Sequence, residues 1–598
     1  MRDFAEQHES RQDRKILKRF FRYFKPHVRT FILAFILMIF GTITGLILPL
    51  ASGLAIDQMQ DPSLSLSDKL WIVGIGTVVL LISSGISTYV SYLQNIMLQK
   101  VGQKITHEIR HQVYDHINTL SIGQINQLPV GKLVTRATND PANISTMFTS
   151  TLVDVIRSFL TMVIIGSILF AINPIMALYT ITIVPVIVFA SQIYRNAARG
   201  AYRDVRNKIS ELNGYLSEHL SGMKVVQVFN QQEKIKRSFS IANHELKKSS
   251  LKEMYTFAVY RPLLFLLSMT ATLIAIYVGV SSILDGVLTV GLFVSFYVYV
   301  GQFYEPIQQI SEQLNTLQSS FASAEKIFDV LDTKPDVVDE DDAIELPSFK
   351  GHVVFKDVWF SYLPNEWVLK GISFEILPNE TVAFVGATGS GKTTILQLIV
   401  RNYDIQKGDI LIDGISIKKI KRSSLRKFIG QMLQDVFLFS GSIRDNITLA
   451  NEAITDANIQ QASKYVGLDY VINKHPEGLQ YQVKERGKNF SSGERQLISF
   501  ARALVYQPSL MILDEATANI DSETETIIQE SLEKMMSIST MIIVAHRLST
   551  IQHSDRIIVM QKGEIKETGT HQALLKNKGL YYNLYLLQYD QKKSPSSL

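Results

Sequence analysis

The sequence predicts two parts of different fold class, an α-helical membrane domain followed by an α/β domain. Long apolar runs are confined to the region before about residue 305. Beyond it, the apolar segment "TVAFV" leads into the glycine-rich "GATGSGKTT", and about 120 residues later the apolar "LMILDE" ends in two acidic residues. A strand, a glycine-rich loop and a helix in this order are typical of a P-loop. The predicted fold class is therefore a helical membrane domain with six transmembrane helices plus an α/β P-loop nucleotide-binding domain.

The composition limits the classes of function. Of the 598 residues, 46% are hydrophobic, and the mean hydropathy of +0.12 is high for a soluble protein. The net charge of +5 is too small for this length to indicate nucleic-acid binding, so no nucleic-acid partner is expected. The absence of cysteine excludes disulfides, cysteine-ligated zinc sites and thiol catalysis, including an attached papain-like peptidase. The first 30 residues are charged throughout, so no cleavable signal peptide is expected.

Six apolar stretches are long enough to cross a bilayer, which requires roughly 20 helical residues. They run approximately over residues 31–56, 70–98, 151–172, 174–194, 255–283 and 287–305. The lipid bilayer is therefore a predicted partner, and the chain is expected to be a multi-pass protein of the cell membrane.

Basic residues are concentrated on one side of these spans. The loop after the first span carries Asp57, Asp61 and Asp68 against one lysine. By contrast, the segment before the first span and the loops after the second and fourth spans are basic, with Arg11, Arg14, Lys15, Lys18, Arg19, Arg22, Lys25, Arg29, Lys100, Lys104, Arg110, Lys132, Arg136, Arg195, Arg199 and Arg203. Since basic loops stay on the cytoplasmic side, both termini and the α/β domain are predicted to be cytoplasmic.

The two inner loops are about 50 and 60 residues long and have helix-compatible apolar periodicity. Helical arms of this length reach well beyond the membrane, and the alternative is a flexible loop. Further on, the acidic "LDTKPDVVDEDDAIELPSFKG" is typical of a linker. We predict a transmembrane domain with cytoplasmic helical extensions over 1–330, a linker over 331–344 and an ATP-binding domain over 345–598.

The glycine-rich segment fits the pattern G-x-x-x-x-G-K-[ST] between a strand and a helix. Its glycines let backbone N–H groups approach phosphates, and the following helix start favours anions. Lys392 is expected to reach the β- and γ-phosphates and Thr393 to ligate Mg²⁺. The predicted ATP-binding residues of this loop are Gly386, Ala387, Thr388, Gly389, Ser390, Gly391, Lys392, Thr393 and Thr394.

The acidic pair that ends "LMILDE" completes a hydrolytic site. Nucleotide hydrolysis needs one carboxylate to hold Mg²⁺ and another to orient the attacking water. Asp514 is predicted as the metal-binding residue and Glu515 as the catalytic one. The alternative is a strand that simply ends in solvated acids, which the preceding P-loop disfavours.

Two further segments resemble the ABC-transporter family. "FSSGERQLISFARAL" resembles its signature motif, usually LSGGQ, and "IIVAHRLSTI" is similar to its switch-histidine segment. With six preceding spans, the chain resembles a bacterial ABC exporter half-transporter from end to end. This resemblance implies an exporter-type membrane domain, ATP and Mg²⁺ as cofactors, and ATP hydrolysis coupled to transport.

The resemblance also implies roles for four single residues. Tyr362 matches the aromatic residue that stacks on adenine, and Gln434 matches the loop glutamine that senses Mg²⁺ and the attacking water. His546 matches the histidine that contacts the γ-phosphate, and Asp521 matches the loop that crosses to the other nucleotide domain. The alternatives are core packing for Tyr362 and a buried, hydrogen-bonded role for His546.

The signature departs from the family pattern. The resemblance implies that Ser491, Ser492, Gly493 and Glu494 meet an ATP bound by a partner subunit. Ser492 adds a Cβ at the family's first glycine, and Glu494 replaces a glutamine. At roughly 6 Å from the phosphate, a carboxylate would cost roughly 3 kcal/mol per unit phosphate charge. The alternative is that Glu494 turns away to pair with Arg495 or Lys488.

The chain keeps the residues needed for hydrolysis, Lys392, Asp514, Glu515 and His546, beside an unusual signature. This combination predicts a heterodimer. A second ABC half-transporter would supply an ordinary signature over this P-loop, while "FSSGE" closes a degenerate site on that partner. The predicted function is ATP-driven efflux of small lipophilic or amphipathic compounds, that is, multidrug export. The alternatives are a lipid or lipopeptide flippase and an ATP-gated channel.

Some residues of the spans are candidates for the transport path. The sixth span is rich in aromatic residues, namely Phe293, Phe296, Tyr297, Tyr299, Phe303 and Tyr304. They suit flat, apolar, cationic ligands, but helix packing is the preferred interpretation for most of them. Asp154 and Arg157 are three apart and could neutralise each other on one helix face. Asp57 is either a loop acid or part of an external gate.

Overall fold

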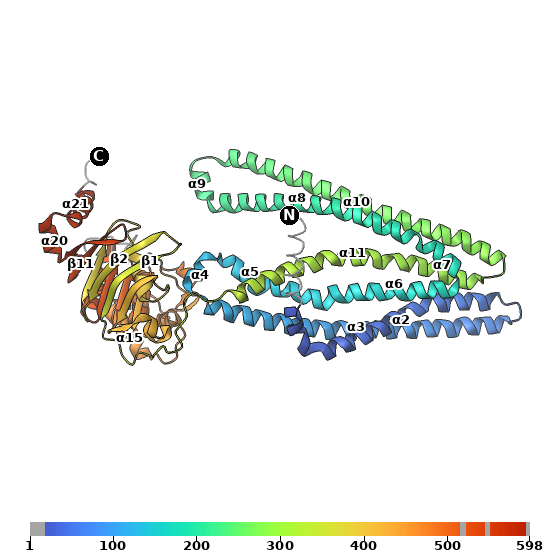
Figure 1. The fold of residues 1–598 in the computed structure, drawn as a ribbon, viewed down its shortest axis with the longest axis horizontal. Coiled ribbons are helices and arrows are strands. Elements are labelled where there is room, and N and C mark those ends of the chain that lie inside the picture. Colours follow the sequence, from blue (N-terminus) through green and yellow to red (C-terminus); the bar gives the residue numbers. More distant parts are fainter. Residues whose placement is uncertain (1–17, 515–521, 545–550, 594–598) are drawn as a thin grey trace. The chain divides into compact units, whose positions relative to one another are not determined.

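The computed structural model describes residues 18–514, 522–544 and 551–593. It divides into two units, which are described separately (Figure 1). The first unit contains residues 1–118 and 130–333, and the second contains residues 119–129 and 334–598. Residues 119–129, which lie in the first predicted inner loop, thus group with the second unit.

The first unit consists of helices, most of them long. They are α2 (Val28–Gln60), α3 (Leu66–Thr119), α5 (Val130–Thr146), a π-helical turn η2 (Met147–Thr151), α6 (Leu152–Ile172), α7 (Pro174–Ile181), α8 (Ile183–Ser221), α9 (Met223–Val228), α10 (Gln232–Leu284) and α11 (Val290–Asp332). A short 3-10 turn, η1 (Lys25–His27), precedes α2. Both inner loops are therefore helical extensions of the spans. In Figure 1, α8 and α10 run side by side with α9 at their tip.

Five continuous helices of the described residues are long and apolar enough to cross a membrane: Lys18–Gln60, Leu66–Thr119, Val130–Ile172, Pro174–Ser221 and Gln232–Leu284. They contain the first five predicted spans. The sixth predicted span forms the start of α11. Its tyrosines, together with Gln302 and Glu305, make this stretch less apolar than the other five. The count of six spans therefore stays a prediction.

Local sequence explains the tight turn between the third and fourth spans. Asn173 caps α7, because its side chain accepts hydrogen bonds from the backbone N–H groups of Ile175 and Met176 at 3.1 Å each. Pro174 occupies the first helical position, where its fixed φ suits a helix start. This pattern reverses the chain within the few residues that the sequence leaves between the two spans.

Small residues allow α2 and α11 to approach closely near the outer end of the predicted first span. A Cβ on Gly53 would lie 2.3 Å from the carbonyl oxygen of Gly291, so neither helix accepts a larger residue there. One turn further on, Asp57 accepts hydrogen bonds from the Gly291 N–H and the Thr289 hydroxyl, both at 2.6 Å. Asp57 therefore caps the start of α11 rather than standing free in a loop.

The second unit contains two larger sheets that share one core, and a two-stranded antiparallel sheet of β7 (Gly441–Ser442) and β8 (Gln482–Val483). The six-stranded sheet has the order β12-β11-β3-β10-β9-β6, with parallel pairing from β11 to β6. The four-stranded sheet has the order β2-β1-β4-β5 and is antiparallel. The strands are β1 (Val353–Ser361), β2 (Trp367–Ile376), β3 (Thr381–Val385), β4 (Lys407–Ile412), β5 (Ile415–Ser416), β6 (Ile429–Met432), β9 (Leu510–Asp514), β10 (Thr540–Val544), β11 (Arg556–Gln561) and β12 (Glu564–Gly569).

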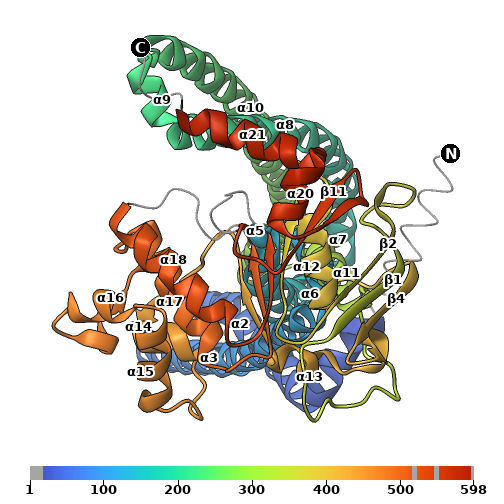
Figure 2. The same ribbon diagram turned by 90° about the vertical axis from the view of Figure 1, so that its left-hand side faces the viewer.

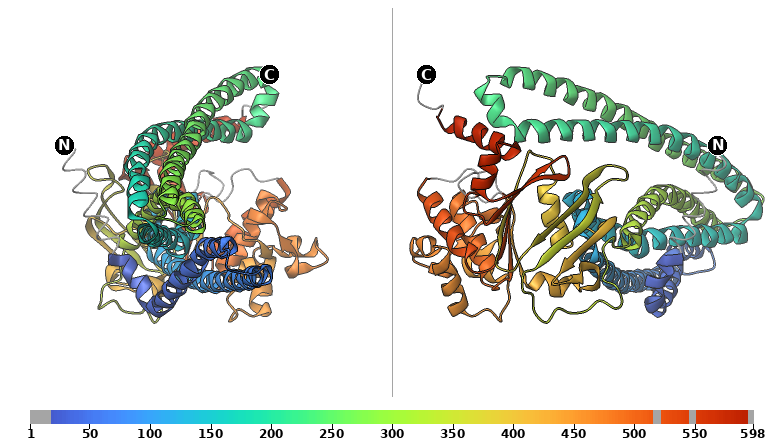
Figure 3. Two further views of the ribbon diagram at one scale, coloured as in Figure 1. Left: turned by 90° about the vertical axis from the view of Figure 1, so that its right-hand side faces the viewer. Right: turned by 60° about the vertical axis from the view of Figure 1, so that its left-hand side comes forward.

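Helices pack against these sheets on more than one side. They are α12 (Lys392–Ile399), α13 (Arg422–Lys427), α14 (Ile443–Thr448), α15 (Asp456–Tyr465), α16 (Asp469–Asn473), α17 (Ser492–Leu504), α18 (Ser522–Met536), α20 (His571–Asn577) and α21 (Leu580–Lys593). In Figure 2, α14 to α17 gather on one side of the unit and the antiparallel strands β1, β2 and β4 on the other. Figure 3 shows the two sheets from a further direction.

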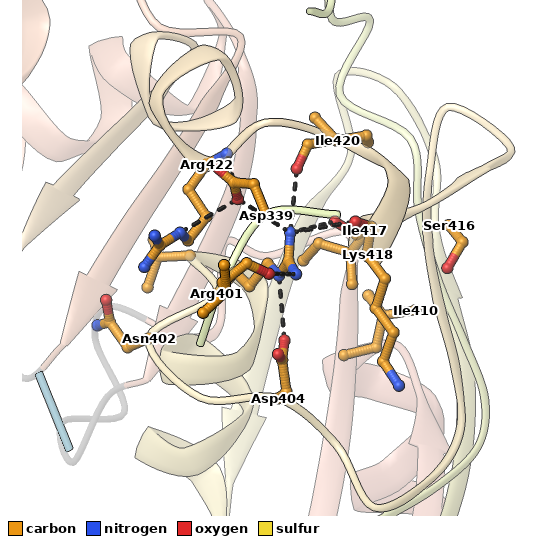
Figure 4. Close-up of polar contacts among 12 residues, drawn as sticks. Asp339, Arg401, Asn402, Asp404, Ile410, Ser416, Ile417, Lys418, Ile420 and Arg422 are labelled. Carbon is orange, nitrogen blue, oxygen red and sulfur yellow. Dashed lines mark hydrogen bonds and ion pairs between the residues drawn. The ribbon is translucent and has the colours of Figure 1, made fainter. Parts of the chain in front are cut away.

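A buried arginine fastens the acidic linker to this unit (Figure 4). Arg401, which follows α12, is 1% exposed. Its guanidinium donates to Asp404 at 3.0 Å, to Asp339 at 3.4 Å and to the carbonyl oxygen of Val338 at 3.0 Å. Arg422 donates to the same Asp339 oxygen at 3.1 Å. Because a buried charge is tolerated only when paired and hydrogen-bonded, this cluster fixes the linker that follows α11.

Asp339→Ala should lower the stability of the second unit, because Arg401 and Arg422 would lose a shared acceptor. We expect a loss of about 2 kcal/mol, or about 5 °C in the unfolding midpoint. Fluorescence of Trp359 and Trp367 reports on this unit when the full-length protein also carries Trp71→Phe, because Trp71 belongs to the membrane unit. The matched control is Glu345→Ala, whose ion pair with Lys421 is exposed on both sides. Equal shifts for the two variants would contradict the anchoring role of Asp339.

Candidate functional site

The predicted site residues follow the carboxyl ends of neighbouring parallel strands. In the register of the sheet, Val544 of β10 pairs with both Phe384 of β3 and Asp514 of β9, and Met432 of β6 pairs with Leu513. The glycine-rich loop after β3, the acid that ends β9 and the segment after β6 therefore share one edge of the sheet. Ligands of open parallel sheets bind at this edge.

The loop after β3 has the backbone that the P-loop prediction requires. Gly391 is the N-cap of α12 with φ +102°, and a Cβ there would lie 2.7 Å from the Leu369 side chain. Lys392 is 6% exposed, and its ammonium donates to the carbonyl oxygens of Gly386 and Ala387 at 2.8 and 3.1 Å. Lys392 thus curls over its own loop, where a phosphate oxygen can take the place of the carbonyls.

The remaining P-loop residues differ in exposure. Ala387, Thr388, Gly389 and Thr393 are exposed, and Ser390 and Thr394 are buried. Within the described parts of the chain, the buried hydroxyl of Ser390 has no hydrogen-bond partner. An anion held in this loop would give that hydroxyl an acceptor. The loop therefore fits the phosphates of a nucleotide.

Three predicted Mg²⁺ ligands lie at the same edge. Asp514 ends β9 and is 7% exposed, whereas Gln434, two residues after β6, and Thr393 are exposed. A carboxylate, an amide and a hydroxyl are oxygen ligands of the kind that Mg²⁺ prefers. The donor set therefore fits this ion.

Tyr362 lies beside the P-loop helix. It is 44% exposed, and its hydroxyl donates to Thr394 at 3.1 Å. Phe360 and Tyr403 contact it edge-on, with ring centroids at 4.9 and 5.1 Å. Partial burial raises the pKa of the Tyr362 phenol above its ordinary value, so the ring stays neutral. These contacts fix the ring while leaving part of it open to a base.

Three predicted residues lie outside the described part of the chain. They are Glu515, Asp521 and His546. Glu515 directly follows Asp514, and His546 is two residues beyond the end of β10. Their predicted roles remain proposals.

The signature forms the start of α17, with Ser491 as its N-cap. The Ser491 hydroxyl accepts from the Glu494 N–H at 3.1 Å, and the Glu494 carboxylate accepts from the Ser491 N–H at 2.8 Å. This reciprocal pair is a capping box. Gly493 is required for packing, because a Cβ there would lie 2.6 Å from the Thr524 side chain.

The carboxylate of Glu494 does not point freely toward a phosphate site. Its second oxygen accepts from the Lys474 ammonium at 2.8 Å. Burial raises the pKa of Glu494, but the hydrogen bonds from Lys474 and from the Ser491 N–H outweigh this and hold it below the usual range. The expectation of an unpaired charge at the signature is therefore wrong. Glu494 does pair with a cation, as the alternative stated, but the cation is Lys474 and not Arg495 or Lys488.

In the membrane unit, Asp154 and Arg157 bind amides instead of each other. Arg157 donates to Gln94 of α3 at 2.9 Å, and Gln313 of α11 donates to Asp154 at 3.4 Å. Within the described residues, no ion pair within 4.0 Å joins Asp154 to Arg157, and the Gln94 amide nitrogen is buried without a partner. The two opposite charges on this helix therefore act on each other at longer range, without a direct ion pair. Polar groups of α3, α6 and α11 meet here.

Most aromatic residues of α11 pack inside the helical unit. Phe296 and Tyr299 are fully buried, Phe303 and Tyr304 nearly so, and Tyr297, at 46%, is the most exposed of the six. The Tyr304 hydroxyl donates to the Thr180 carbonyl at 2.8 Å, and the Tyr299 hydroxyl donates to the Leu46 carbonyl. These contacts confirm the packing interpretation for four of the six.

A further contact was not found from the sequence. Helix α4 (Ile122–Gln127) belongs to the nucleotide-binding unit, and a Cβ on Gly123 would lie 2.5 Å from the ring of Tyr403. Gln124 donates to the Lys334 carbonyl at 2.7 Å. The capping box between Ser121 and Gln124, visible as "SIGQ", is a sequence signal that could have located this helix.

Comparison with known proteins agrees with this arrangement. The family model of the ABC transporter transmembrane region matches residues 31–307, and the ABC transporter model matches residues 369–518. The chain is 39% identical over 516 residues to the "Probable multidrug resistance ABC transporter ATP-binding/permease protein YheH" of Bacillus subtilis (strain 168), covering 85% of this chain and 76% of that protein.

Two further proteins are similar over nearly the whole chain. The "ATP-dependent lipid A-core flippase" of Syntrophus aciditrophicus (strain SB) is 32% identical over 587 residues, which cover 98% of this chain and 96% of that protein. The solved structure of a bacterial Atm1-family ABC exporter with ATP bound has a TM-score of 0.79 at 26% identity. That match covers 96% of this chain and 99% of the other.

The chain therefore belongs to the ABC transporter family. It is an ABC exporter half-transporter, with the transmembrane region and the ATP-binding domain in one chain, and it has bacterial homologues. It is an ATP-hydrolysing transporter.

Replacing Tyr362 tests its role in nucleotide binding. Tyr362→Ala should weaken ATP binding about 5- to 150-fold, because one base–aromatic stack contributes about 1–3 kcal/mol. Tyr362→Phe keeps the ring and loses only the bond to Thr394, so its affinity should stay within about threefold of wild type. Equilibrium titration with a ribose-labelled fluorescent ATP measures both. A phenylalanine variant as weak as the alanine variant would contradict the stacking role.

Proposed function

We propose that this chain is one half of a transporter that uses ATP to export lipophilic or amphipathic compounds across the cell membrane. The observation that carries the proposal is the shared edge of β3, β9 and β6, where a P-loop, a buried acid and an exposed glutamine converge in a chain that also carries the exporter helices. The basic inner loops support a cytoplasmic location for both termini and the ATP-binding domain.

The residues of this edge have separate tasks in hydrolysis. Tyr362 stacks on the adenine, and Lys392 with the P-loop N–H groups holds the phosphates. Asp514, Thr393 and Gln434 would hold Mg²⁺, and the bound ion would offset the charge of the phosphate oxygens. Glu515 accepts the proton of the attacking water, and His546 donates a hydrogen bond to the γ-phosphate. For Asp521, the proposed role is contact with the nucleotide-binding domain of the second subunit.

Amphipathic compounds are the substrate class that the membrane unit favours. Apolar residues line its spans, whereas Arg157, Asp154 and Gln94 form a polar cluster near the predicted inner ends of the second and third spans. A molecule with an apolar body and a polar head finds partners for both parts there. The relative of this chain named a multidrug resistance transporter supports this class of substrate.

A second subunit is part of the proposal. Val225, Val228 and Phe229, in and beside α9, are apolar and each more than 60% exposed. Such an exposed apolar tip suits a protein partner. We infer a different half-transporter as that partner, since Ser492 adds a Cβ where the family has glycine while the P-loop, Asp514 and Glu515 are complete.

Lipid translocation is the second candidate function. The relative named a lipid A-core flippase is similar over 98% of this chain, which favours it over the channel alternative. The two candidates differ in the readout: export of a soluble lipophilic dye against its gradient, or transfer of a labelled lipid between leaflets.

The experiment that tests the exporter proposal is ATP-dependent accumulation of a fluorescent lipophilic cation in inside-out membrane vesicles. Accumulation against the gradient is expected for the wild type. Glu515→Gln should keep ATP binding and lower turnover about a hundredfold, because general base catalysis contributes at least that factor. Turnover above about half of the wild-type value in the assembled transporter would remove Glu515 from the catalytic role. Passive dye movement independent of ATP would contradict the exporter itself.

The heterodimer proposal is tested by purifying the chain alone and together with its partner. Alone, the chain should give little drug-stimulated ATPase activity, and co-expression with the partner should restore it. The matched control is the co-expressed pair with Glu515→Gln, which separates assembly from catalysis. A fully active, drug-stimulated homodimer would contradict the inference.

A further inference from the structure

The unusual signature residue Glu494 has a counter-ion that comes from a different part of the chain. Lys474 directly follows α16 and lies 20 positions before Glu494. Its ammonium is 2.8 Å from the Glu494 carboxylate, whose side chain is only 9% exposed, while the Lys474 side chain is 56% exposed. The other carboxylate oxygen is bound to the Ser491 N–H. Both oxygens of Glu494 therefore have donors.

The two basic residues nearest to Glu494 in sequence are used elsewhere. Arg495 donates to the carbonyl oxygen of Phe490 at 2.7 Å, and Lys488 pairs with Glu485 at 3.2 Å. Both residues thus have other partners, and Lys474 is the basic side chain that donates to the Glu494 carboxylate.

An aromatic cluster holds Lys474 in reach of the signature. His475, the next residue, stacks on Tyr481 with centroids 3.6 Å apart. Phe490, the residue before Ser491, contacts both rings edge-on, at 5.9 and 5.7 Å. The segment that carries Lys474 and the start of α17 are therefore packed together, which makes the ion pair a built feature of the domain.

Charge balance explains what this pair does. A helix start attracts a phosphate through its free N–H groups and its dipole, and a lone carboxylate there would oppose that attraction. Glutamine supplies the same capping oxygen without charge. A glutamate paired with a lysine supplies the capping oxygen and also has no net charge, so the pair is electrostatically similar to the amide.

We infer that Lys474 is a positioning residue of the signature: it neutralises Glu494 and keeps the start of α17 attractive to the γ-phosphate of a nucleotide held by the partner subunit. The inference rests on the proposed function, in which α17 meets that nucleotide across the subunit interface. On this inference, the ATP site that this chain's signature covers on the partner subunit is weak because of Ser492 and not because of the charge of Glu494.

A double-mutant cycle tests this inference. Lys474→Met, Glu494→Gln and the double variant are compared in the transporter purified through a tag on this chain, so that any partner is retained. The readouts are vanadate-dependent trapping of a labelled ATP and the KM for ATP. Lys474→Met should weaken trapping and raise KM about tenfold, because it exposes one unit charge near a phosphate. Glu494→Gln is the reference without the carboxylate, and the double variant should match it in both values, because loss of Lys474 then exposes no charge.

Three controls separate the charge effect from loss of structure. Lys474→Arg keeps a cation and should keep near-normal trapping. Lys488→Met removes an exposed lysine of the same segment and should have no effect. The thermal midpoint is recorded for every variant, and trapping is measured well below it. A merely structural role for Lys474 would lower the midpoint without the tenfold change in KM.

Two outcomes would overturn the inference. If Lys474→Met leaves trapping unchanged, the charge of Glu494 does not reach the nucleotide. If Glu494→Gln alone strengthens trapping about tenfold, the carboxylate is not neutralised in the wild type. In either case Glu515→Gln would still abolish transport. Failure of the proposed function itself would instead appear as transport that survives Glu515→Gln.

Discussion

The parallel pairing of β3, β10, β9 and β6 is the constraint on which the ATP-binding domain depends. The register of these strands brings the loop after β3, Asp514 and the segment of Gln434 to the same edge of the sheet. In the sequence, about 120 residues separate that loop from Asp514. Strands β3, β9 and β10 are buried on both faces, so a shift in register would displace apolar residues as well as ligands. The packing of the core therefore also fixes the positions of the site residues at this edge.

Within the same domain, contacts at the end of α12 join the P-loop helix to the linker and to helix α4. Arg401, two residues after the P-loop helix, donates a hydrogen bond to Asp339 of the linker. Tyr403, two residues further on, packs its ring against Gly123 of α4. Tyr403 also contacts Tyr362 edge-on. The residues that hold the nucleotide, the linker and the first inner loop thus share a few contacts at the end of α12.

Sequence reasoning located those features whose signal is local. The P-loop depends on glycine spacing, and the turn at Asn173 depends on adjacent cap residues. Features that depend on distant partners were missed or misjudged. Arg157 binds Gln94, 63 positions away, and Glu494 binds Lys474 across a helix and a loop. Arg495 and Lys488 are nearer to Glu494 in the sequence. The aromatic contact of His475 with Phe490, which no sequence periodicity indicates, instead brings Lys474 to Glu494.

The central claim is that the start of α17 covers a nucleotide held by a second subunit. Because the chain lacks cysteine, Lys488→Cys gives a single site for a spin label just before the signature. The most direct measurement is the distance from this label to Mn²⁺ bound with ATP, in the tagged complex carrying Glu515→Gln. We predict that Mn–ATP produces a short distance across the subunit interface, distinct from the longer one to the P-loop of the same chain. A distance to the chain's own P-loop alone would contradict the account.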